Sequence, residues 1–178
     1  MKKIVSLLLF VPFVAQSFKV DFSDVDMSRR PSEVMDAIIK KIEPEIKKAA
    51  QKSFAAIAYF YNQVQGGINI TPEKIELLEK LSQIESPYPE QIVETVFKAK
   101  RQEIKEYCHK DFYPGMHNDY QGDVSQFAQC VMDQYKNALK ASKAGKFLKE
   151  QREKGLVTRD GRIPGYWDTF KRFLGFTV

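Results

Sequence analysis

The residue types in this chain that could do chemistry gather in one segment, where two cysteines enclose the only two histidines. Each histidine is followed two positions later by an aspartate, and the six residues are Cys108, His109, Asp111, His117, Asp119 and Cys130. Thiolate, imidazole and carboxylate are the usual ligands of zinc, so a metal-dependent enzyme built on His109 and His117 is one hypothesis. The spacing matches no standard zinc finger, and these residue types also suit a helix end and turns. We therefore expect no bound metal, no other cofactor and no catalytic activity.

The two cysteines favour a structural role. Cys108 lies near the end of one predicted helix and Cys130 about two turns into the next, so an αα-hairpin can bring the two sulfurs together. Although His109 is adjacent to Cys108, neighbouring helical residues point in different directions, which argues against a nucleophile–base pair. In an exported protein such cysteines form a disulfide, which should stabilise the fold by about 3 kcal/mol.

Residues 1–17 have the three parts of a secretory signal peptide. Lys2 and Lys3 form the positive region, residues 4–15 are mostly apolar, and small residues precede a cleavage site before Phe18. The alternative is an uncleaved anchor that keeps the protein associated with a membrane. That stretch contains a proline and is short for a span, which needs about 20 apolar residues. We expect cleavage, and a secreted or lumenal protein.

Beyond the leader, apolar residues repeat with the period of an α-helix. Pro31 suits the first turn of a helix, and the apolar stripe continues from there to the Gly66-Gly67 pair, which is a stop signal. Pro44 interrupts the pattern, because a proline inside a helix removes one backbone hydrogen bond. The sequence therefore predicts a kink or a break near Glu43.

Two more helix starts follow this first segment. Thr71 as a hydroxyl cap, Pro72 at the first helical position and Glu73 in the first turn are typical of a helix N-terminus. We expect the apolar face of that helix to hold Ile75, Leu78 and Leu81, with Leu77 and Ile84 beside them. Residues 86–89 end it and begin a helix of about five turns that reaches the first cysteine.

The second half of the chain predicts a hairpin partner for that helix. Residues 110–122 are polar and read as a loop, and Asp123 resembles a helix cap. The next helix is expected to fray near Gly145 and to end by Gly155. No stretch has the alternation of a strand. The expected fold is all-α, an antiparallel bundle of four to five helices with a disulfide-linked αα-hairpin, and it divides into a leader (1–17), a helical domain (18–160) and a C-terminal tail (161–178).

The C-terminal tail is rich in aromatic residues. Five large apolar residues, Trp167, Phe170, Phe173, Leu174 and Phe176, form a candidate interface. On a helix, Trp167, Phe170 and Leu174 would share one side, and Lys171 and Arg172 would lie on the opposite side. The tail can fold back onto the bundle, bind a partner protein, or rest on an anionic membrane surface or lipid. We expect the first turn to pack on the bundle, and Phe173 and Phe176 to contact a partner.

Asn69-Ile70-Thr71 is an N-glycosylation sequon. It has meaning only in a eukaryotic secretory route. The cap role of Thr71 competes for the same hydroxyl, and Pro72 crowds the acceptor site.

Composition limits the class of function. Hydrophobic residues make up 43% of the 178, which suffices for a core, and the net charge is +5. Because the basic residues alternate with glutamates, we expect no nucleic-acid partner. The leading hypothesis is a non-catalytic interaction protein of the secretory or lumenal space, or an accessory subunit of a membrane-associated complex. The alternative, besides the metal-dependent enzyme, is a helical carrier of a lipid or other apolar ligand.

Overall fold

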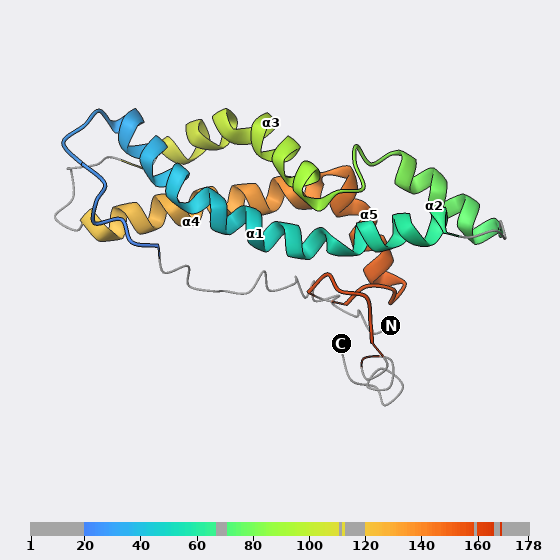
Figure 1. Cartoon of the computed structure of the whole chain (residues 1–178). Helices are drawn as coiled ribbons and strands as arrows, with labels where there is room; N and C mark the ends of the chain where they lie inside the picture. Colours follow the sequence, from blue (N-terminus) through green and yellow to red (C-terminus); the bar gives the residue numbers. More distant parts are fainter. Residues whose placement is uncertain are drawn as a thin grey trace, which may run out of the picture.

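The computed structural model describes residues 20–66, 71–110, 112, 120–158, 160–165 and 168. The described residues form five helices and no strand: α1 (Pro31–Gln65), α2 (Pro72–Ser82), α3 (Pro89–His109), α4 (Tyr120–Ala141) and α5 (Lys143–Glu153). The three long helices α1, α3 and α4 run alongside one another, whereas α2 and α5 lie toward the end of the bundle at which α1 finishes (Figure 1). The all-α prediction is therefore confirmed.

The first helix runs continuously from Pro31 to Gln65 through Pro44, so the break, one of the two predicted alternatives, does not occur. Its buried residues continue on both sides of the proline, from Ile38 and Ile42 to Ile46 and Ala50. A proline inside a helix costs about 3 kcal/mol, and burying one large aliphatic side chain contributes about 1.5–3 kcal/mol. The buried face of α1 therefore outweighs the lost hydrogen bond.

Ion pairs at the surface match the antiparallel register of α1 and α3. Asp36 near the start of α1 pairs with Lys105 near the end of α3, and Lys47 farther along α1 pairs with Glu94 near the start of α3. Both N–O distances are 2.7 Å. Such pairs contribute little stability by themselves, but a shift of either helix would separate both.

Aromatic rings join α3 to α4 inside the bundle. The rings of Phe97 and Tyr135 stack with centroids 3.9 Å apart, and Tyr135 is wholly buried. Phe112, just beyond α3, packs on Phe127 of α4 with centroids 4.7 Å apart. These contacts hold the two arms of the hairpin together along most of their shared length.

The helix predicted from Asp123 to Gly155 begins earlier and is divided in two. It starts at Tyr120, so Asp123 lies in the first turn rather than at the cap. The chain breaks at Ser142, whose hydroxyl accepts a hydrogen bond from the Gly145 N–H at 3.0 Å and so caps α5. A Cβ at Gly145 would collide with the backbone carbonyls of the last turn of α4. Glycine thus allows a sharp corner where the sequence indicated only fraying.

The second helix buries only part of the face predicted for it. Leu81 is buried, and so is Ile84, which lies just beyond the end of the helix; Leu77 is partly buried. Ile75 and Leu78, by contrast, are exposed. The Tyr61 hydroxyl of α1 donates to the Leu81 carbonyl at 2.6 Å, which fixes the end of α2 against α1. Of the three residues expected on the apolar face, only Leu81 is in the core.

Candidate functional site

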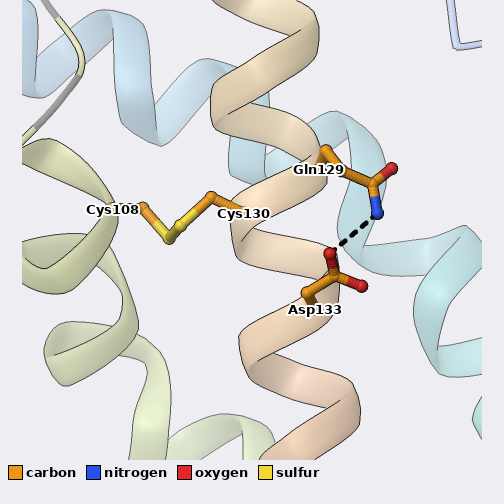
Figure 2. Close-up of a disulfide and its surroundings, with 4 residues drawn as sticks. All are labelled: Cys108, Gln129, Cys130 and Asp133. Atoms are coloured by element: carbon orange, nitrogen blue, oxygen red, sulfur yellow. Dashed lines mark hydrogen bonds between the residues drawn. A yellow bond between two sulfur atoms is a disulfide. The ribbon is translucent and has the colours of Figure 1, made fainter.

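The two cysteines form the predicted disulfide. Cys108 in the last turn of α3 is bonded to Cys130 of α4, with Cα atoms 5.9 Å apart (Figure 2). Gln129 donates to Asp133 at 3.0 Å on the other side of α4 (Figure 2). Because both sulfurs are covalently paired, neither is a thiolate that could ligate a metal or attack a substrate.

Few of the other candidate residues fall in the described part of the chain. His109 is the last residue of α3 and is exposed. Outside the described residues lie Asp111, His117, Asp119, Asn69, Trp167, Phe170, Phe173, Leu174 and Phe176. Within the described ranges, no three His, Cys, Asp or Glu side chains are grouped so as to hold a metal ion. Thr71 is the N-cap of α2, and its hydroxyl accepts from the Lys74 N–H at 3.3 Å.

A groove of about 650 Å³ lies between the end of α1, α2 and the chain that follows α5. We call it the α2 groove; its apolar walls are formed by Tyr59, Phe60, Leu77, Leu156, Ile163 and Pro164. Tyr59 is 42% exposed and Leu156 48% exposed, so two of its large side chains face solvent. Nothing in the sequence indicated this groove, because its walls come from three separate segments.

Opposite charges on the rim of the α2 groove neutralise one another. Lys80 of α2 hydrogen-bonds to Glu76 at 2.8 Å and to Glu150 of α5, and Lys154 pairs with Glu150 at 2.9 Å. The hydrogen bonds from Lys80 are the main cause that lowers the pKa of both glutamates. These two cations and two anions balance one another, which leaves Glu73 as the charged lining residue outside this network. The apolar walls are then what the groove offers to a ligand.

The outer face of α2 is a second apolar feature at the same end. Ile75 and Leu78 are each 46% exposed, and their spacing of three places them on one side of the helix. We call this pair the α2 ridge. The sequence contains both apolar stripes of α2, and only the contact with α1 decides which one is buried.

A smaller groove of about 360 Å³ lies between α3 and the corner of α4 and α5. Its lining includes Val96 and Ile92 of α3 together with Ala99, Ala138 and Ala141. Both this groove and the α2 groove are open to solvent, whereas a carrier encloses most of the surface of its ligand.

Comparison with known proteins finds no matching family model, no matching curated protein and no matching solved structure. Among the described residues, no helix has an apolar stretch sufficient to cross a membrane. The functional argument therefore depends on the geometry of the chain itself.

Proposed function

We propose that the protein is a non-catalytic helical interaction protein that binds a partner protein through the α2 ridge. The observation that carries this proposal is the exposure of Ile75 and Leu78 side by side on a helix with a single buried residue, Leu81. Scattered exposed apolar residues are ordinary, but adjacent ones mark binding surfaces more often. A helix that lays an apolar ridge into a partner's groove is a recurrent mode of recognition.

The exposed apolar residues are concentrated at the end of the molecule where α2 lies, which supports a docking surface there. Among the described residues, six large apolar side chains are exposed, and four of them, Tyr59, Ile75, Leu78 and Leu156, lie on α1, α2 and the segment after α5. The other two, Tyr88 and Tyr107, lie at the two ends of α3, and none lies on α4 among the side chains whose burial is described. A concentration of this kind is expected for a docking end rather than for an evenly solvated bundle.

The partner is proposed to lie in an oxidising compartment. The Cys108–Cys130 disulfide is consistent with a secreted or lumenal protein, and the leader at 1–17 supports export. The second version of the proposal places the protein in a membrane-associated complex as an accessory subunit, attached through a retained N-terminal segment.

Site-specific photo-crosslinking in the native source tests this function. A photoreactive residue at Leu78 should give one discrete adduct with a partner protein, and the same residue at the exposed Lys98 of α3 should give none. Changing Ile75→Glu in the Leu78 probe should reduce the adduct about 10-fold or more, because a charge would enter the centre of the contact. Equal labelling from both positions, or an adduct that survives Ile75→Glu, would contradict the proposal.

A further inference from the structure

We propose that the α2 groove is filled by the C-terminal segment 166–178 of the same chain, whose apolar side packs on Tyr59 and Leu156. The α2 ridge lies outside this contact. The inference goes beyond the proposed function and does not depend on it.

The chain enters this segment from the wall of the groove itself. Ile163 and Pro164 are part of the lining, so the segment begins where the groove begins. The Asp168 carboxylate accepts a hydrogen bond from the Gly165 N–H at 3.0 Å, three residues before it. An acid that reaches back three residues to a backbone N–H is the geometry of a helix start. A helix that starts here needs no linker to reach Tyr59 or Leu156.

The chain is anchored to α1 just before that point. Thr158 accepts from the Arg162 N–H at 3.0 Å, which closes a short turn. Gly161 in this turn has a φ of 82°, and a Cβ there would collide with the backbone of Ser53 on α1. The turn is therefore pressed against α1 at a position only glycine allows. This contact sets where the following segment leaves the bundle.

The sequence of the segment complements the groove. Trp167, Phe170 and Leu174 are three and four residues apart, so on a helix they form one apolar side for the half-exposed Tyr59 and Leu156. A helix of the segment's first 11 residues would be roughly 16 Å long. Because the segment is joined directly to the groove wall, its effective concentration there is in the millimolar range of short linkers. A separate partner protein would have to compete with this attached segment for the groove.

Charge supports the same orientation. Lys171 and Arg172 occupy the side of the segment opposite its apolar residues. With the apolar side packed on the groove walls, these two cations keep their charges in solvent rather than in the apolar contact. Phe173 and Phe176 remain available for a partner.

The single tryptophan of the chain makes the test direct, since Trp167 lies in the proposed segment. In the folded full-length protein, Trp167 emission should be blue-shifted, and its quenching by acrylamide should be several-fold slower than in urea. Leu156→Glu should remove both differences, because it places a charge on the groove wall. The matched control is Leu78→Glu, which changes an equally exposed leucine outside the groove and should leave Trp167 unaffected.

Folding controls and contrary outcomes complete this test. Circular dichroism confirms that each variant is folded, and Tyr59→Lys serves as a second groove variant if Leu156→Glu fails to fold. Fast quenching in the wild-type protein, or equal effects of Leu156→Glu and Leu78→Glu, would overturn the proposal. Emission that changes on dilution would show that the segment occupies the groove of a second copy instead. Loss of the adduct from the Leu78 probe with Ile75→Glu, together with unchanged Trp167 emission in Ile75→Glu, would separate this inference from the proposed function.

Discussion

At the scale of single residues, Tyr135 shows that a core can bury an aromatic ring even though its hydroxyl loses its hydrogen bonds to water. Its ring stacks on Phe97, and its hydroxyl is buried near Glu43 with no hydrogen bond of normal geometry to any described residue. Burial is the main cause that raises the pKa of this hydroxyl well above its ordinary value, and the nearby negative charge of Glu43 acts in the same direction. The hydroxyl therefore stays neutral and contributes desolvation cost without a compensating bond.

Removing that hydroxyl should stabilise the protein. We expect Tyr135→Phe to raise the free energy of unfolding by about 1 kcal/mol, since the stacked ring is kept and the unsatisfied group is lost. The control is Tyr61→Phe, which removes a hydroxyl that donates to Leu81 at 2.6 Å and should lower stability by about 1 kcal/mol. Urea denaturation measures both. A loss in Tyr135→Phe as large as in Tyr61→Phe would mean that the buried hydroxyl has a partner.

At the scale of elements, local signals predicted the buried faces of the long helices and the first three helix starts, but not the division of the last helix or the outer side of α2. Prolines at the first helical position correctly marked the starts of α1, α2 and α3. The division at Ser142 was missed, because the hydroxyl cap matters only once Gly145 lies against the end of α4. The predicted face of α2 was only partly right: Leu81 and Ile84 are buried, whereas Ile75 and Leu78 are exposed, because only tertiary contact with α1 decides which side of this helix enters the core.

The candidate site shows the same limit more strongly. The disulfide was predictable, because a hairpin brings two cysteines 22 residues apart together. The α2 groove was not, because Tyr59, Leu77 and Leu156 are brought together only by the packing of α1, α2 and the chain after α5. Sequence spacing carries no information about such contacts between distant segments.

The attachment of α2 to α5 should depend on pH. Hydrogen bonds from Lys80 hold the pKa of Glu76 and of Glu150 below the ordinary value of a glutamate. A carboxylate whose pKa is lower in the folded state than in the unfolded state stabilises the folded protein. This contribution is complete at pH values above the unfolded-state pKa, and it is lost as the pH falls through the folded-state pKa. We therefore expect thermal stability to fall between about pH 5 and about pH 3, and less steeply in Lys80→Met.

A matched variant separates this bridge from general acid effects. Lys100 pairs only with Glu103 three residues away within α3, at 2.6 Å, so Lys100→Met should keep the wild-type pH slope. Melting temperatures measured across the acidic range for the three proteins give the comparison. A Lys80→Met slope as steep as that of the wild type would show that the α2–α5 bridge does not couple stability to pH.

At the scale of the whole molecule, one covalent bond joins the two arms of the hairpin against which α1 and α5 pack. The disulfide ties the end of α3 to α4, while the stacked Phe97 and Tyr135 lie farther along the same pair of helices. Both helices also contact α1, so the hairpin and α1 form a three-helix body. Loosening one end of the hairpin therefore weakens a body on which α2 and α5 depend.

Breaking the disulfide should accordingly lower global stability without changing the fold. We expect the double variant Cys108→Ser with Cys130→Ser to lose about 3 kcal/mol of unfolding free energy, mainly because the unfolded chain regains the freedom of the loop between the two positions. Natural domains have about 5–15 kcal/mol in total, so this loss is large enough to decide whether the protein survives in a reducing compartment. Urea unfolding of the oxidised protein, the reduced protein and the double variant provides the measurement. The reduced protein and the double variant should unfold at the same urea concentration, below that of the oxidised protein, and all three should have similar circular dichroism before unfolding. Equal midpoints for the oxidised and the reduced protein would show that the bond does not form in the native molecule.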